Sequence, residues 1–204
     1  EQMKLAAPDD ILVFVDIDCI PLNSNVISEA IQFAENGGIW ACSQVSNHLS
    51  DPTHEFLAPL FHAIQKKTWL KIGSPSYQRN GDNDVGQRVT RYAEEHAIPL
   101  HFSKPEYSLI PKYRFNQHYP YGIGCFFQGG IFHLYESRRK EFRPLFTQVC
   151  DAILNHQGID YLDLTNQALD IEAKRRLMNK IKAPIRAINN SSRFIRKKIK
   201  QIFS

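Results

Sequence analysis

The chain has 204 residues and a formal net charge of +4, with 43% hydrophobic and 23% charged residues. This length is enough for one buried core, and this composition is ordinary for a globular protein. No apolar run is long enough to cross a bilayer. The four cysteines are widely spaced, so the sequence indicates neither a zinc site nor a disulfide framework, and we expect a cytoplasmic protein with reduced thiols.

The first strong pattern is the apolar run 11–15, which leads into Asp16 and Asp18 and is closed by Pro21. An unbroken apolar run of this length predicts a strand buried on both faces. Side chains alternate along a strand, so Asp16 and Asp18 are expected on the same side. Two carboxylates at the end of a buried strand repel each other, and Mn²⁺ or Mg²⁺ relieves that repulsion. The segment predicts a metal site, with a pair of solvated aspartates as the alternative.

The next elements alternate between helix and strand, which is typical of an α/β fold. Residues 23–25 offer a helix N-cap ahead of apolar residues at helical spacing, and residues 39–42 predict a second buried strand. The polar residues Gln44, Asn47 and His48 follow that strand. They are candidates for substrate binding, because neighbouring strand ends face one crevice. Turn formation is the equal alternative.

Residues 59–69 predict a short helix or an irregular segment, and residues 84–97 predict a clear helix with one apolar face. Asp84 stands at the start of that second helix. A carboxylate there either caps free N–H groups or acts as a catalytic base.

Residues 104–124 are rich in Tyr, Pro and His and predict a binding loop, with a packed loop as the alternative. Tyr121 in this segment is a candidate for substrate binding. His133 lies in a short predicted strand and is a candidate metal ligand, although a lone histidine among apolar residues is more often a hydrogen-bonded core residue. Further helices are predicted at 143–156 and 162–177.

The C-terminal segment 174–204 is strongly basic, with eleven lysines and arginines and no acid. Isoleucine and phenylalanine recur between these bases at three- and four-residue spacing. This pattern predicts a basic amphipathic helix lying on an anionic membrane surface. Nucleic acid is not expected as a partner, because no recognised reading motif accompanies the charge; docking on a missing domain is the plainer alternative. The chain therefore divides into a core (1–150), a helical extension (151–178) and a basic amphipathic tail (179–204).

Residues 13–22, with Asp16 and Asp18, resemble the DxD segment of GT-A-type glycosyltransferases. Later segments fall in a compatible order: 43–48, 73–77, 84–90, 121–124 and 132–138. The resemblance covers roughly residues 9–140 and implies an α/β, GT-A-like (nucleotide-diphospho-sugar transferase) sheet flanked by helices, followed here by the helical basic tail. Only fifteen residues precede Asp16. The nucleotide-binding half that family members carry before the DxD strand is therefore expected to be missing, and the core to be N-terminally incomplete.

The resemblance also implies roles for single residues. Asp18 would bind the metal that bridges the donor diphosphate, and Asp16 would hold the ribose or the metal's water shell. His133 matches the histidine that completes the metal shell, while Asp84, then Asp82, matches the base of inverting members. The implied function is a metal-dependent, hexosyltransferase-like enzyme of cell-surface glycan synthesis. It would use Mn²⁺ or Mg²⁺ to move sugar from a UDP- or GDP-sugar donor to a glycan or another hydroxyl acceptor, at the inner face of the membrane.

Two other functions stay open. Haloacid-dehalogenase-like phosphatases also place Asp-x-Asp after a first strand, and Asp16 would then be the nucleophile, with 81–84 imitating their late acidic motif. Against this, that motif should follow an apolar strand, whereas the polar segment 76–80 precedes it here. The third possibility is a non-catalytic membrane-binding module, which has no need for Asp16 and Asp18 to share an ion.

Overall fold

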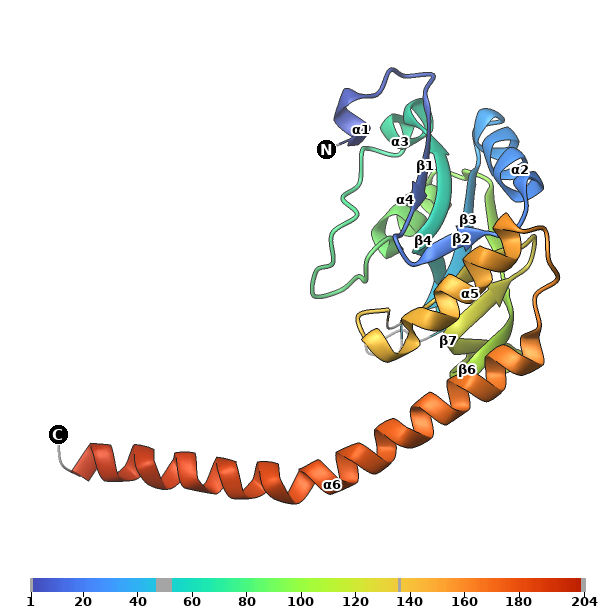
Figure 1. The fold of residues 1–204 in the computed structure, drawn as a ribbon. Helices are drawn as coiled ribbons and strands as arrows, with labels where there is room; N and C mark the ends of the chain where they lie inside the picture. The colour runs from blue at the N-terminus through green and yellow to red at the C-terminus, as the bar shows by residue number, and fades with distance from the viewer. Residues whose placement is uncertain (1, 47–52, 136, 203–204) are drawn as a thin grey trace.

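The computed structural model describes residues 2–46, 53–135 and 137–202, and it shows an α/β protein with mixed sheets flanked by helices (Figure 1). The strands are β1 (Ile11–Val15), β2 (Cys19–Pro21), β3 (Ile39–Val45), β4 (Glu55–Gln65), β5 (Leu100–Ser103), β6 (Pro105–Phe115), β7 (Tyr119–Phe127) and β8 (Ile131–His133). The helices are α1 (Gln2–Leu5), α2 (Ser24–Glu35), α3 (Lys66–Lys71), α4 (Gln87–Glu95), α5 (Arg143–Leu154) and α6 (Tyr161–Ile202), with a short 3₁₀ helix at Lys140–Phe142.

Eight strands form two four-stranded sheets in the described ranges. The first has the order β1-β4-β3-β5, with β4 antiparallel to both neighbours and β5 parallel to β3. The second has the order β2-β8-β7-β6 and is antiparallel throughout. Because β1 and β3 both run opposite to β4, their C-terminal ends lie on the same side of the first sheet. The candidate site lies beyond these strand ends.

Alternation along β3 separates two layers of core. Ile39 and Ala41 face the helices on one side of the first sheet, where they join a buried cluster with Val89 of α4. Trp40 and Cys42 face the other side and pack in a cluster with α2 and β7. A third cluster joins the second sheet to the C-terminal helices through Phe132, Phe142, Leu145, Leu164 and Ala168. Each fully buried side chain of this kind stabilises the fold by about 1.5–3 kcal/mol.

Strand β1 departs from the sequence prediction. A strand buried on both faces was expected at 11–15, but β1 is an edge strand of the first sheet and pairs only with β4. Its residues are half-buried, and Val15 is exposed. The strands of this sheet that are buried along most of their length are β3 and β4. Strand β4 lies between β1 and β3 and is buried from Phe56 to Gln65 except at Pro59.

Two further predictions are wrong. Residues 59–69 were expected to be helical or irregular, yet 55–65 form β4 and only 66–71 form a helix. Residues 104–124 were expected to be a loop, yet they supply most of the β6–β7 hairpin, whose register shifts twice. The aromatic residues of that segment therefore have fixed positions on strands instead of the freedom of a loop.

The helices agree better with the sequence. Asn23 is the N-cap of α2, and its side chain accepts the backbone N–H groups of Asn25 and Val26 at 3.0 and 3.2 Å. The helix predicted at 84–97 is shorter, because α4 begins at Gln87 after a left-handed Gly86. The proposed division at 150/151 falls inside α5, and the one at 178/179 falls inside α6. None of the described helices is long and apolar enough to span a membrane.

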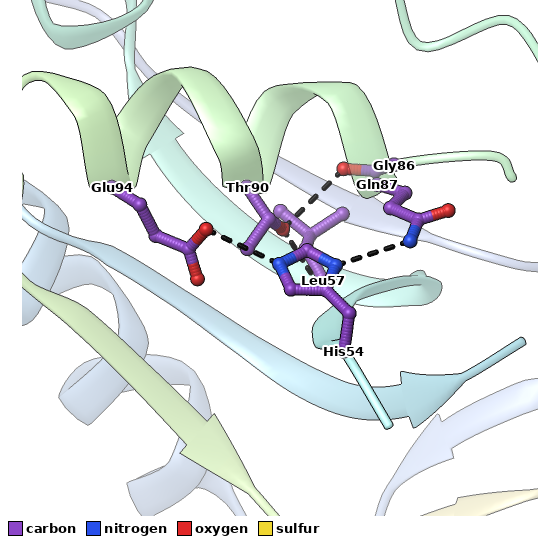
Figure 2. A network of polar contacts seen from close by, with 6 residues as sticks. All are labelled: His54, Leu57, Gly86, Gln87, Thr90 and Glu94. Carbon is purple, nitrogen blue, oxygen red and sulfur yellow. Dashed lines mark hydrogen bonds and ion pairs between the residues drawn. The ribbon is translucent and has the colours of Figure 1, made fainter. Parts of the chain in front are cut away.

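A polar network fixes α4 against the start of β4 (Figure 2). His54 lies between Glu94, 3.2 Å from its Nε2, and Gln87, whose amide nitrogen is 3.1 Å from its Nδ1. The Thr90 hydroxyl accepts the buried N–H of Leu57 at 3.0 Å. Because the side-chain oxygen of Gln87 also accepts the N–H of Asp84 at 2.9 Å, this network holds the loop that precedes α4.

The centre of β4 carries a buried histidine, His62. Its ring stacks on Phe14, with 4.4 Å between centroids and an angle of 8°, and on Tyr77 at 5.3 Å. Within the described residues neither ring nitrogen has a hydrogen-bond partner. Burial therefore lowers the pKa of His62 from 6.5 to about 3, because the charged imidazolium would lose its hydration without gaining a partner.

Candidate metal centre

Asp16 and Asp18 lie in a tight turn that follows β1. The N–H of Asp16 donates to the carbonyl of Leu60 at 2.9 Å, which is the last tie to β4. The N–H of Cys19 then donates to the carbonyl of Asp16 at 3.0 Å and closes the turn into β2. The expected alternation along a strand is thus replaced by a turn, and the turn brings the two carboxylates together.

His133 reaches the same place from the second sheet. It is the last residue of β8 and pairs in register with Cys19 on β2 and Cys125 on β7. Just beyond it, the N–H of Leu134 donates to the carbonyl of Asp18 at 2.9 Å, so the backbone of the turn is tied to β8. His133 Nε2 lies 3.4 Å from Asp18 Oδ1. One ligand atom each from Asp16, Asp18 and His133 can be chosen so that all lie within 4.8 Å of one another.

The electrostatics of the two carboxylates differ. Burial, with the neighbouring charge of Asp18, raises the pKa of Asp16 in spite of the opposing effect of His133. For Asp18, burial also acts to raise the pKa, but the hydrogen bonds from His133 and Ser137 outweigh it and the pKa is lowered. Asp18 therefore ionises more readily than Asp16, and the charge on Asp16 is the less favourable of the two.

These three residues line a cavity of about 370 Å³. Two residues that the sequence marked for substrate binding line it as well: Gln44 near the end of β3, and the buried Tyr121 on β7. Further lining residues are Pro59, Leu60, Tyr135, Ser137 and Arg138. The cavity therefore combines acidic groups, one guanidinium group and two phenol rings, and these rings meet edge-on with centroids 6.0 Å apart.

Sequence reasoning assigned no role to Tyr135, Ser137 and Arg138. Their signal was their position within five residues of His133, since a short turn after a strand end stays beside that end. The backbone confirms this closeness: the N–H of Ser137 donates to the carbonyl of Leu134 at 3.2 Å. Tyr135 also has Lys112 Nζ over its ring, 5.5 Å from the centroid. Arg138 and Lys112 thus place positive charge near a mostly acidic pocket.

The candidate bases stand apart from this cavity. Neither Asp82 nor Asp84 is among the described residues that line it. Asp82 is exposed, and the side chain of Asp84 accepts the N–H of Val85 at 2.9 Å without capping α4. Asp84 is nevertheless close enough to raise the pKa of Tyr113, after the larger effects of burial, Cys125 and Tyr135. Asn47 and His48 lie outside the described residues.

The donor set suits a divalent cation. Two carboxylates provide hard oxygen ligands for Mg²⁺ or Mn²⁺, and the imidazole favours the more tolerant Mn²⁺. His133 is itself buried, and its Nδ1 has no hydrogen-bond partner among the described residues. Two carboxylates and an imidazole that lie within 4.8 Å of one another could hold such an ion.

No protein-family model matches this chain, and no curated protein or solved structure shows significant similarity to it.

Proposed function

We propose that this protein is a metal-dependent glycosyltransferase that uses a nucleotide-diphosphate sugar. The observation that carries the proposal is the convergence of Asp16, Asp18 and His133 at the rim of one cavity. The resemblance around the DxD segment points to the same residues. Asp18, Asp16 and His133 would hold Mn²⁺ or Mg²⁺, which supplies positive charge to the diphosphate leaving group of a UDP- or GDP-sugar.

The chain's own side chains supply the remaining interactions. The Arg138 guanidinium, at the cavity wall, is suited to bind phosphate oxygens. Tyr135, which is 43% exposed, offers aromatic surface against which a sugar ring can stack. The buried Tyr121 borders the cavity, and Gln44 offers an amide for sugar hydroxyls. Gln44 and Tyr121 come from β3 and β7, whereas Tyr135 and Arg138 lie just after β8.

In the transfer step, the acceptor hydroxyl oxygen bonds to the anomeric carbon as the bond from that carbon to the diphosphate oxygen breaks. The electron pair of the broken bond stays on the diphosphate, and the hydroxyl proton passes to a carboxylate base. Asp84 is the proposed base, with Asp82 second. The hydrogen bond from its N–H to the Gln87 side chain fixes the backbone of Asp84. Because Asp84 does not line the cavity, this role requires an acceptor that extends beyond the cavity wall. A glycan or another hydroxyl-bearing molecule would be the acceptor.

The phosphatase alternative has less support. It places the nucleophilic aspartate after a buried strand, whereas β1 is a half-buried edge strand. It also leaves His133 without a role, although His133 Nε2 lies 3.4 Å from Asp18 Oδ1.

Calorimetric titration with Mn²⁺, in the presence and absence of UDP or GDP, tests the proposal. Wild type is expected to bind Mn²⁺ and to bind it more tightly with the nucleotide. Asp18→Asn removes a charged ligand and should weaken Mn²⁺ binding by at least roughly tenfold, since even the loss of an outer hydrogen-bond partner costs 10- to 100-fold. Asp9→Asn is the matched control, because Asp9 is an exposed aspartate ahead of β1 and far from the turn at its other end.

The other outcomes contradict the proposal in distinct ways. Metal binding that ignores both nucleotides would reject the nucleotide-sugar donor, and hydrolysis of a simple phosphate ester by the same sample would favour the phosphatase. Equal metal binding by wild type and Asp18→Asn would place the ion elsewhere. An absence of metal binding would reject both enzymes and favour the non-catalytic module.

A further inference from the structure

Helix α6 is much longer than the core needs. Its first turns pack on the second sheet: Leu164 and Ala168 are buried, and the hydroxyls of Tyr107 and Thr165 lie 2.6 Å apart. Beyond that point the helix continues to Ile202 and projects away from the body of the protein (Figure 1). At 1.5 Å per residue, the part from residue 174 onward extends about 40 Å.

The chemistry of α6 changes where it leaves the core. Its acidic residues, Asp163, Asp170 and Glu172, all precede residue 174. Segment 174–204 then carries eleven lysines and arginines and no acid, whereas residues 1–173 hold 14 bases and 21 acids. The projecting half of the helix therefore has a net positive charge, and the rest of the protein has a net negative charge.

An apolar series runs through the same half. Its positions are spaced by three or four residues, apart from one interruption at Ser192: Met178, Ile181, Ile185, Ile188, Ile195, Ile199 and Ile202. In a continuous helix this spacing places the positions on one face. Met178 and Ile181, the two that belong to the described surface, are 46% and 54% exposed. The first two positions of this apolar face are therefore not covered by the core.

The basic residues and the apolar face together distinguish among three possible partners of this half of α6. A second copy in a coiled coil would bring basic flanks together with no acid to pair them. A nucleic acid would use the bases but leave the isoleucine series in water. An anionic bilayer surface uses both, because the apolar side chains enter the acyl boundary while the bases meet lipid headgroups.

We propose that residues 174–202 form a helix that lies on an anionic bilayer surface and holds the acidic core beside it. This inference rests on charge and apolar spacing in α6 and is independent of the proposed metal chemistry. Under this proposal the protein is a peripheral membrane protein, bound at the inner, anionic face of a membrane.

The test is co-sedimentation of the whole protein with phosphatidylcholine vesicles that either lack or contain about one third phosphatidylserine. We expect binding to the anionic vesicles only, weakened by salt. Replacing Lys197 and Lys198 by glutamine should lower the partition coefficient roughly 25-fold, at about fivefold per base. Lys67→Gln with Lys71→Gln is the matched control: it makes the same charge change on exposed residues of the core and should leave the partition coefficient within about twofold.

A second variant tests the apolar contribution at constant charge. Ile195→Ser with Ile199→Ser should also release the protein from anionic vesicles. Equal losses in the core control would reject the tail as the binding segment. Retention of the serine variant, together with tight binding of an oligonucleotide, would favour nucleic acid; light scattering that shows an oligomer dissociated by the serine changes would favour a second copy. Either result would overturn the proposal.

Discussion

Replacement of His62 by phenylalanine should remove part of the acid sensitivity of the fold. In the unfolded chain the imidazole of His62 has a pKa near 6.5, whereas in the folded protein burial lowers this pKa to about 3. Between these values the unfolded state binds more protons, so the free energy of unfolding falls as the pH falls. The loss attributable to His62 is about 2 kcal/mol between pH 7 and pH 5, and about 5 kcal/mol when it is complete.

His62→Phe keeps a flat ring between Phe14 and Tyr77 and removes two buried nitrogens that have no partner among the described residues. The variant should be at least as stable as wild type at pH 7, because an unsatisfied buried polar atom costs about 1–3 kcal/mol. It should be more stable by an additional 2 kcal/mol or so at pH 5. Urea unfolding followed by circular dichroism at pH 7, 6, 5 and 4 measures both differences.

The control is His101→Phe on β5, where a partly buried imidazole stacks on Trp40 with 5.4 Å between centroids. That variant removes an imidazole elsewhere in the first sheet and serves as the reference for the loss of a histidine as such. The comparison also cancels the contribution of carboxylates to the pH dependence of stability. Glu172 is an example, because hydrogen bonds from Arg175 lower its pKa to about 2. If wild type and His62→Phe lose stability in parallel as the pH falls, then His62 is not the buried base and the reasoning is refuted.

Two predictions concern the contact between α4 and β4. Gly86→Ala should cost more than about 1 kcal/mol, because the residue has a φ of +85° and a Cβ there would meet the carbonyl oxygen of Leu57 at 2.4 Å; thermal unfolding measures it, and Gly81→Ala, which meets nothing within 4 Å, should be nearly neutral. Thr90→Val should cost about 1–3 kcal/mol by leaving the Leu57 N–H unpaired. Thr147→Val on the exposed face of α5 is its control, and equal losses in the two threonine variants would contradict the assignment.

The residue types of the candidate site were predictable from local patterns, but their meeting was expected only through the resemblance, which groups His133 with Asp16 and Asp18. Asp16 and Asp18 stand out because two acids follow an apolar run, and that pattern holds whether the chain continues as a strand or turns. The contact between Asp18 and His133 depends on the pairing of β2 with β8, across more than one hundred residues of sequence. Register over such a distance is fixed by packing of the two sheets, which no local pattern reports.

The mistaken elements have physical causes as well. Residues 56–64 are apolar at almost every position, and such a run fits a buried strand or a buried helix equally well. Strand β6 contains Pro105 and Pro111, which weaken any strand signal. Proline is tolerated there because β6 is at the end of the second sheet, where one side of the backbone needs no partner. Helix α6 was predictable in both its parts, although not as one element that continues through Pro184.

Because β1 stands at the lateral edge of its sheet, the candidate metal centre is open to influence by a segment added from outside. Within the part of the chain that the structure describes, one row of its backbone N–H and C=O groups faces no other strand, and its five residues include no charge to discourage pairing. An extended segment added along this edge would cover Val15 and enclose the adjoining turn. The carboxylate of Asp16 would lose more of its hydration, and its pKa without metal would rise further. Strand addition at β1 would thus tune the affinity for a cation several residues away, with no change in any ligand.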